Sequence, residues 1–259
     1  MTDLPNETNG NDPNDDQSAV QVWHAEISSD QPGHVESCCE AWLDPDEVKR
    51  ADKLRQRTSR NQHVVGRGMA RRLLGHRLQG SVSPTDIRFA EAVYGKPYVT
   101  QPEQAKQPFN VAHTDGLVMC GVGTQQHQLV GVDVERLGRR TDPGLAERFF
   151  SAPEIEFLNS KTDDCQRRNA FLRIWTLKES YIKAIGTGLQ TPLADFAFTE
   201  IDSDQPKIRM LNPDLQDEYQ WQFFSIEPQP GFIGALAVAT LADQQPAQFD
   251  LKCFAELIQ

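Results

Sequence analysis

Two short segments carry carboxylates and cations at spacings that suit metal-assisted phosphate chemistry. In GVDVERL, residues 131–137, Asp133 and Glu135 lie two positions apart among β-type residues. In a strand such residues project from one face, so both carboxylates would point the same way. Two close carboxylates repel each other unless they face water or share a cation, and Mg²⁺ typically takes one or two carboxylates plus substrate phosphates. A solvated strand face and a hard-cation site both fit this segment.

The second segment is WTLKESYIK, residues 175–183, in which Trp175, Glu179 and Lys183 follow the spacing i, i+4, i+8 of one helix face. A Glu four residues before a Lys is a common surface pair that contributes roughly 0.2–0.5 kcal/mol. Alternatively, Glu179 supplies a third carboxylate to the same cation, Lys183 contacts a phosphate, and Trp175 packs in the core.

Three further side chains could donate hydrogen bonds to phosphates. They are Lys96 in YGKP, and Asn110 and His113 in FNVAH. Each also fits a structural role, because a Gly-Lys-Pro segment is often only a turn and a lone histidine often belongs to the packing.

The elements that must position these residues follow from hydrophobic periodicity. Residues 43–80, 145–160 and 169–186 have helical patterns, whereas residues 87–135 consist of short β-type runs broken by Gly and Pro. The remaining sequence predicts antiparallel strands. Helices and strands are grouped rather than strictly alternating, which favours an α+β fold over a parallel doubly wound sheet.

Each half of the chain carries a helix and about three strands, so the sequence predicts two halves. We expect an N-terminal half at residues 19–127 and a C-terminal half at residues 128–259 that carries both charged segments. Residues 1–18 are rich in Asn, Asp and Pro and nearly lack apolar side chains, which predicts a disordered tail.

The composition is that of an ordinary soluble globular protein, with 38% hydrophobic and 24% charged residues among 259. A formal net charge of −11 argues against a general affinity for nucleic acid or anionic membranes. No stretch approaches the ~20 apolar residues of a membrane span, and no signal-peptide pattern begins the chain, so a cytoplasmic location is expected. The five cysteines lack Cys-x-x-Cys spacing, which predicts free thiols and no structural zinc.

Four segments in this order resemble the 4′-phosphopantetheinyl transferases, specifically the double-length, surfactin-type branch. The segments are YGKP, FNVAH, GVDVE and WTLKESYIKAIGTGL. The resemblance covers most of residues 40–200. It implies a pseudo-twofold monomer in which two similar α+β halves enclose one site. It also implies that phosphopantetheine moves from coenzyme A to a serine of an acyl or peptidyl carrier protein, with release of 3′,5′-ADP.

The resemblance further implies roles for the charged residues. Asp133, Glu135 and Glu179 would hold Mg²⁺ against the pyrophosphate, and Glu179 would accept the serine proton directly or through water. Lys183 and His113 would contact phosphates, so that Asp133, Glu179 and Lys183 form the catalytic group.

For coenzyme A, the resemblance implies a binding set of Arg50, Gly95, Lys96, Pro97, Asn110, His113 and Lys183. Arg50 would contact the 3′-phosphate, and the Gly95–Pro97 segment would line the adenine and ribose end. Residues 57–63, RTSRNQH, are less basic than in many relatives, so the 3′-phosphate contacts stay open. Arg67 and Arg71 are candidates, and ordinary helix-surface charges are the alternative.

Two other functions stay open at this point. The same carboxylates would suit a Mg²⁺-dependent nucleotide phosphohydrolase, and the fold would suit a catalytically silent module that binds carrier proteins. The carrier protein and its pathway are not determined by the sequence. Because carrier proteins are usually acidic, docking requires a local basic or apolar patch, for which residues 137–158 are the candidate.

Overall fold

The computed structural model describes residues 18–139 and 144–259, so the predicted tail lies outside the described residues except for Ser18. The first part of the chain contains the following helices and strands: β1 (Val20–Glu26), α2 (His34–Glu40), α3 (Pro45–Asp52), α4 (Arg57–Arg77), β2 (Arg88–Glu91), β3 (Pro97–Gln101), β4 (Phe109–Thr114) and β5 (Leu117–Val122).

The rest of the chain contains a second series: β6 (His127–Arg136), α5 (Gly144–Phe149), α6 (Ala152–Asn159), α7 (Asp164–Ile185), β7 (Phe196–Thr199), β8 (Lys207–Met210), β9 (Gln220–Ile226), β10 (Phe232–Thr240) and β11 (Phe249–Cys253). Short 3₁₀ helices lie at Pro84–Asp86, Glu103–Ala105, Gly188–Gln190, Leu193–Asp195, Pro213–Leu215 and Phe254–Leu257. Among the described residues, no helix has the length and apolar character that crossing a membrane requires.

The two series repeat one order of elements. Each runs through a strand, two short helices, a long helix, a two-stranded hairpin and two more strands. In each sheet the last of these strands lies in the middle: β5 pairs with β1 and β4, and β10 pairs with β6 and β9, all antiparallel. The prediction of an α+β fold with two similar halves is therefore confirmed.

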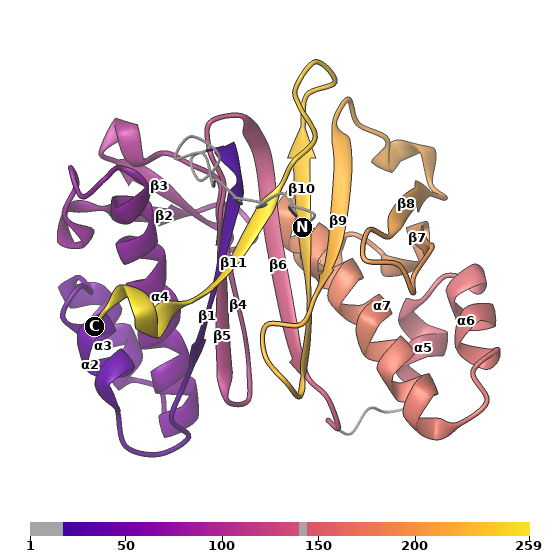
Figure 1. Ribbon diagram of the computed structural model, residues 1–259, viewed down its shortest axis with the longest axis horizontal. Helices are drawn as coiled ribbons and strands as arrows, with labels where there is room; N and C mark the ends of the chain where they lie inside the picture. The colour runs from indigo at the N-terminus through magenta and orange to yellow at the C-terminus, as the bar shows by residue number, and fades with distance from the viewer. Residues whose placement is uncertain (1–17, 140–143) are drawn as a thin grey trace, which may run out of the picture.

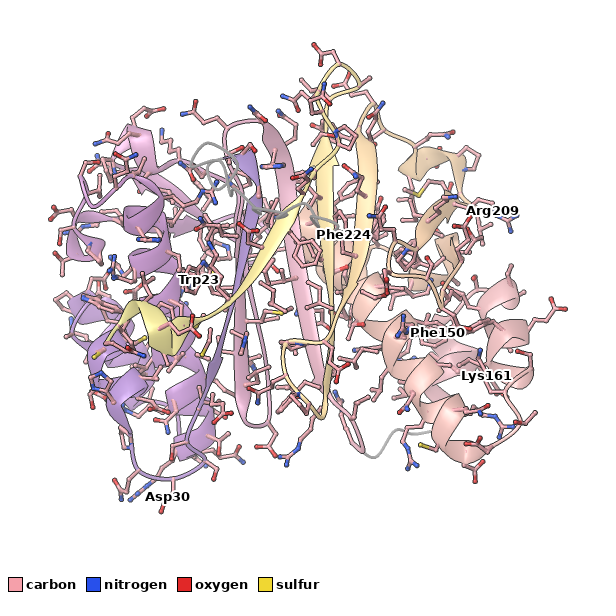
Figure 2. All side chains as sticks on the ribbon, viewed as in Figure 1. Trp23, Asp30, Phe150, Lys161, Arg209 and Phe224 are labelled. Carbon is pink, nitrogen blue, oxygen red and sulfur yellow. The ribbon has the colours of Figure 1, made fainter. Side chains whose placement is uncertain are left out.

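The sheets lie in the middle of the molecule with the long helices outside them, α4 on one side and α7 on the other (Figure 1). Trp23 belongs to the core between α4 and its sheet, and Phe150 to the core around α7. Phe224 belongs to a third core, made by side chains of both sheets (Figure 2). All nine residues of β10, FIGALAVAT, are buried, as expected for a strand covered on both faces.

The last strand does not stay with the second half. β11 pairs in parallel with β1, so Phe249–Cys253 extends the N-terminal sheet (Figure 1). The sequence predicted only antiparallel strands in this region, and that expectation is wrong for β11. The boundary predicted after residue 127 falls at the start of β6, and the division into residues 19–127 and 128–259 stays a prediction.

The backbone of β6 passes very close to α7 at Gly131. A Cβ at this glycine would lie 2.0 Å from the carbonyl oxygen of Ser180 and 2.6 Å from the nitrogen of Ala184. Both neighbours are backbone atoms of a helix and cannot move aside. Only glycine therefore allows this approach.

We predict that Gly131→Ala lowers the free energy of unfolding by about 3 kcal/mol or more, because the added methyl group must push a strand away from a helix. Gly80→Ala is the control. Its methyl group meets nothing within 4 Å, and its positive φ of 74° should cost only about 1 kcal/mol. Equal losses for the two variants in urea titrations would contradict the close-packing account.

Candidate active site

Helix α7 carries Glu179 and Lys183 and has well-defined ends. The side chain of Asp163 accepts a hydrogen bond from the Gln166 N–H at 2.8 Å, which caps the N-terminus. Gly186 ends the helix with φ 75°, a left-handed conformation that favours glycine. The helix predicted over residues 169–186 is thus confirmed.

Asp133 on β6 is buried against Lys183 of α7. Its Oδ1 accepts a hydrogen bond from Lys183 Nζ at 2.5 Å, whereas its buried Oδ2 has no hydrogen-bond partner in the part of the chain that the structure describes. Burial is the main cause that raises the pKa of Asp133 to about 7. Lys183 opposes this rise, and the carboxylates of Glu179 and Glu135 add to it. A further cation would stabilise the negative charge on the Oδ2 oxygen of Asp133.

Glu135 lies on the same face of β6 and is also buried, with 7% of its surface exposed. Its Oε2 accepts a hydrogen bond from Thr114 Oγ1 on β4 at 3.2 Å, and its Oε1 forms an ion pair with Arg139. Sequence reasoning missed both partners. Thr114 directly follows the FNVAH segment, but nothing in the sequence indicates that it reaches β6.

The charges of α7 and β6 influence one another. Burial raises the pKa of Glu179, Lys183 opposes the rise, and Glu135 adds to it. Burial alone would lower the pKa of Lys183, but Asp133, Glu179 and Glu135 outweigh that effect and raise it. The structure therefore brings the three predicted carboxylates and the lysine into one electrostatic cluster.

The cluster is not a ready-made metal site. Among the residues that the structure describes, no three His, Cys, Asp or Glu side chains converge as metal ligands. The donor set nevertheless fits a hard cation, because it offers carboxylate oxygens and includes the unpartnered Oδ2 of Asp133. Lys183 and Arg139 neutralise part of its charge.

A cleft of about 360 Å³ lies between α4 and β4, near the acidic cluster. Its lining residues are Leu54, Ser59, Gln62, His63, Gly66, Arg67, Ala70, Pro97, Phe109, Val111 and His113. Burial, followed by the Lys183 cation, lowers the pKa of His113, and Glu135 opposes this. His113 thus connects the cleft with the carboxylates.

His63 is a cleft residue that sequence reasoning missed. Its Nε2 is buried without a hydrogen-bond partner among the described residues, and burial followed by the Arg67 cation lowers its pKa. The available signal was its spacing of four residues from Arg67, which places both side chains on one face of α4.

The predicted arginines have different surroundings. Arg50 binds Glu91 at 2.6 Å, and Arg67 binds the same carboxylate at 3.3 Å. Arg71 is fully buried, where it binds Asp44 at 2.9 Å and Glu47 at 2.8 Å. Because both acids cap the N-terminus of α3, Arg71 is a structural residue and does not reach the cleft.

The remaining predicted residues lie in the turn before β3, at the start of β3 and on β4. Pro97 lines the cleft, and Gly95 forms the preceding turn with φ 84°. The Lys96 ammonium donates hydrogen bonds to backbone carbonyls of α7 and β6, and the Asn110 amide oxygen accepts one from the β6 backbone. Neither side chain lines the cleft.

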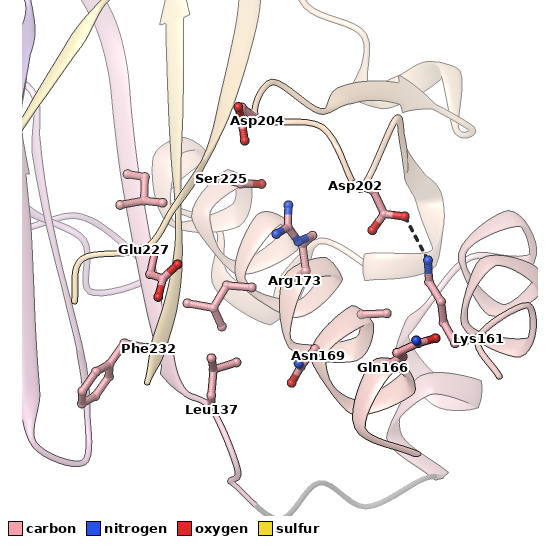
Figure 3. A pocket seen from close by; sticks show the side chains of 13 residues that line it. Leu137, Lys161, Gln166, Asn169, Arg173, Asp202, Asp204, Ser225, Glu227 and Phe232 are labelled. Carbon is pink, nitrogen blue, oxygen red and sulfur yellow. Dashed lines mark hydrogen bonds and ion pairs between the residues drawn. The ribbon is translucent and has the colours of Figure 1, made fainter. Parts of the chain in front are cut away.

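A second cavity, of about 450 Å³, lies along α7 and β9 (Figure 3). Arg173 projects into it, and Lys161 and Asp202 form an ion pair at its rim. None of the predicted site residues lines this cavity. It is therefore distinct from the acidic cluster and its cleft.

Lys178, beside Glu179 in sequence, points away from the cluster. Its ammonium is fully buried and binds Glu154 at 2.9 Å and the carbonyl oxygens of Leu193 and Phe196 at 2.6 Å and 2.8 Å. Trp175 stacks with Phe171, which supports its predicted packing role. Lys178 thus joins α6, α7 and the following loop.

Comparison with known proteins gives the same family as the sequence motifs. The family described as the 4′-phosphopantetheinyl transferase superfamily matches residues 129–241, from β6 to just past β10. The 4′-phosphopantetheinyl transferase HetI from Nostoc sp. is 31% identical over 222 residues, which cover 85% of this chain and 87% of the relative. The chain therefore belongs to the 4′-phosphopantetheinyl transferases, a family of enzymes.

The similarity extends along whole double-length relatives. The transferase Sfp from Bacillus subtilis is 25% identical over 218 residues, which cover 84% of this chain and 91% of Sfp. This coverage supports the predicted surfactin-type branch. Among solved structures, holo-[acyl-carrier-protein] synthase from Thermotoga maritima is 25% identical with a TM-score of 0.37, and covers 44% of this chain and 64% of that one.

We predict that Lys178→Met lowers the free energy of unfolding by about 3–5 kcal/mol, because it leaves Glu154 as an unpaired buried charge. Lys207→Met, which breaks an exposed ion pair with Glu200, should cost under about 1 kcal/mol. Both values are measurable by urea titration. A loss below 1 kcal/mol for Lys178→Met would show that the buried pair is unimportant for stability.

Proposed function

We propose that this chain transfers 4′-phosphopantetheine from coenzyme A to a serine of an apo acyl or peptidyl carrier protein in a Mg²⁺-dependent reaction that releases 3′,5′-ADP. Family membership supports the reaction class. The observation that carries the proposal is the meeting of Asp133, Glu179 and Lys183 beside the cleft. A pyrophosphate under attack needs both cationic partners and a base, and this cluster offers them.

In the proposed reaction the serine oxygen bonds to the phosphorus that carries pantetheine, and the bond from that phosphorus to the 3′,5′-ADP oxygen breaks. Glu179 accepts the serine proton, directly or through water. Burial raises the pKa of Glu179, so that this pKa lies closer to neutral pH than that of an exposed glutamate. Lys183 donates to the pyrophosphate and offsets the charge on the leaving oxygen.

Asp133, Glu135 and Glu179 are the residues that would hold Mg²⁺. The bound ion would neutralise charge on the pyrophosphate. The free Oδ2 of Asp133 supports this assignment, because a buried carboxylate oxygen without a partner is costly. Lys183, whose side chain is 29% exposed, can turn from Asp133 towards a phosphate.

The cleft is proposed to bind the nucleotide end of coenzyme A. His63, Arg67 and His113 offer donors for phosphates, and apolar lining residues such as Phe109 suit a base. Pro97 borders the same cleft, and Gly95 precedes it in the turn. Arg50 shares Glu91 with Arg67 and is the proposed contact to the 3′-phosphate.

We further propose that the protein acts as a cytoplasmic monomer, because one chain supplies both the acidic cluster and the cleft. The carrier protein is proposed to dock on residues 137–158. That segment is described except for residues 140–143. No nucleic-acid or membrane partner is proposed, given the net charge of −11.

The direct test is incubation with coenzyme A, Mg²⁺ and a panel of apo carrier proteins, followed by intact-mass spectrometry. A carrier that gains the mass of phosphopantetheine while 3′,5′-ADP is released supports the proposal. Hydrolysis of coenzyme A without carrier would favour the phosphohydrolase. Carrier binding without a mass gain would favour the silent module.

We predict that Glu179→Gln lowers the transfer rate by roughly 10²–10⁴-fold, because the amide can neither accept the serine proton nor match a carboxylate as a metal ligand. The variant should remain folded, since it keeps the shape of Glu179 and removes one charge from a crowded acidic cluster. Glu200→Gln, at an exposed ion pair, is the control. A Glu179→Gln rate within threefold of the parent would remove Glu179 from the mechanism.

We predict that His63→Ala and His113→Ala raise the KM for coenzyme A more than they lower kcat, as expected when binding is lost equally from ground state and transition state. The affinity for 3′,5′-ADP, measured by calorimetry, should fall in parallel. Gln104→Ala, at an exposed residue outside the cleft, serves as the control. An unchanged KM with a hundredfold lower kcat would contradict the assignment of these histidines to binding.

A further inference from the structure

Strand β6 is an end strand of its sheet, with β10 on one side only. Its other edge lies near β4 of the N-terminal half. An unpaired strand edge presents N–H and C=O groups that are costly to bury without partners. Two of these groups are satisfied by side chains from the other half rather than by a neighbouring strand.

The first of these side chains is Asn110 on β4. Its Oδ1 accepts a hydrogen bond from the N–H of Val132 at 3.0 Å, and 5% of the residue's surface is exposed. The second is Lys96, at the end of the turn that leads into β3. Its ammonium donates to the carbonyl oxygen of Val130 at 3.3 Å. The two side chains thus satisfy backbone groups two residues apart on one strand.

The Lys96 ammonium also binds the end of the long helix. It donates to the carbonyl oxygen of Ala184 at 2.5 Å. Carbonyls in the last turn of a helix lack partners within the helix, and a cation there interacts favourably with the helix dipole. Lysines often bind such carbonyls. Here the lysine lies 88 residues away in sequence, in the other half of the molecule.

Glycine at position 186 makes room for this lysine. A Cβ at Gly186 would lie 3.0 Å from Cδ and 3.4 Å from Cβ of Lys96. The close fit of the lysine stem is therefore independent of the hydrogen bonds and points to the same contact. Within residues 18–139 and 144–259, no acidic side chain forms an ion pair with Lys96, and burial lowers its pKa to about 8.

We propose that Lys96 and Asn110 are positioning residues, whose side chains join the edge of β6 and the end of α7 to the N-terminal half. They act one residue away from the catalytic groups, because Val132 precedes Asp133 and Ala184 follows Lys183. Asn110 also lies three residues before His113 on β4. The contacts therefore set the acidic cluster relative to the cleft. This inference rests on the proposed transfer reaction. It assigns Lys96 and Asn110 a positioning role in place of direct contact with coenzyme A.

The test compares Lys96→Met and Asn110→Ala with the parent chain. The control is Lys106→Met, at an exposed lysine paired with Glu103 on the surface. Hydrogen exchange is measured over residues 128–136 and 180–190, 3′,5′-ADP affinity by calorimetry, and kcat with an apo carrier that the parent modifies. Exchange and affinity do not depend on transfer. A parent chain without transfer activity would therefore refute the proposed function, while these two readouts would still decide the positioning role.

We expect exchange in both segments to accelerate about tenfold or more in each variant, because groups now bonded across the halves would open more readily. The Kd for 3′,5′-ADP should stay within about threefold of the parent value, and kcat should fall about tenfold or more through misplacement of Lys183 and Asp133. Lys96→Arg keeps a cationic donor and should recover part of kcat. Lys106→Met should change none of these values.

A tenfold or greater loss of 3′,5′-ADP affinity with parental exchange rates would overturn the proposal and return both side chains to substrate binding. If Lys96→Met does not fold, Asn110→Ala alone provides the test, because it removes only the side chain that accepts from the Val132 N–H. Parental exchange and kcat in Asn110→Ala would also overturn the proposal.

Discussion

The direct packing of β6 on α7 at Gly131 is the constraint on which the candidate site depends. A strand and a helix usually stay apart by the length of their side chains, but here a missing Cβ lets backbone meet backbone. Asp133, two residues further along β6, is thereby brought within 2.5 Å of Lys183, in the last turn of the helix. A larger separation would leave a buried carboxylate without its cation, a state that is several kcal/mol less favourable.

The N-terminal half completes a cluster whose acids all belong to the C-terminal half. Thr114 of β4 binds Glu135, and His113 lies close enough to Lys183 and Glu135 for their charges to influence its pKa. The cleft itself lies between α4 and β4, entirely on the N-terminal side. The two similar halves therefore supply different parts of the candidate site. The C-terminal half supplies the carboxylates and Lys183, and the N-terminal half supplies the cleft. The contacts of Lys96 and Asn110 across the β6 edge fix the position of the acidic cluster relative to the cleft.

Local patterns in the sequence predicted much of the fold. The helical patterns over residues 43–80 and 169–186 predicted α3, α4 and α7, and the β-type residues around Asp133 predicted the strand β6. These features depend on a few neighbouring residues. The parallel return of β11 was missed because pairing across more than 200 residues leaves no local pattern.

The directions of several site side chains could not be predicted for the same reason. Lys96 was predicted to bind a phosphate, yet its ammonium binds backbone carbonyls contributed by other elements. Arg139 follows the acidic strand, but its ion pair with Glu135 depends on how the chain turns at Gly138. Spacing predicted one strand face for Asp133 and Glu135 and one helix face for Glu179 and Lys183, whereas the partners of each charge required the three-dimensional fold.

The central claim is that the carboxylates of β6 and α7 form a cation site next to the coenzyme A cleft. Anomalous diffraction from crystals grown with Mn²⁺ and 3′,5′-ADP tests it most directly. The account predicts one strong manganese peak within about 2.2 Å of an oxygen of Asp133, with Glu135 or Glu179 as a further ligand and the nucleotide in the cleft beside His63. A nucleotide bound in the cleft with no manganese at Asp133, or manganese bound only elsewhere, would contradict it.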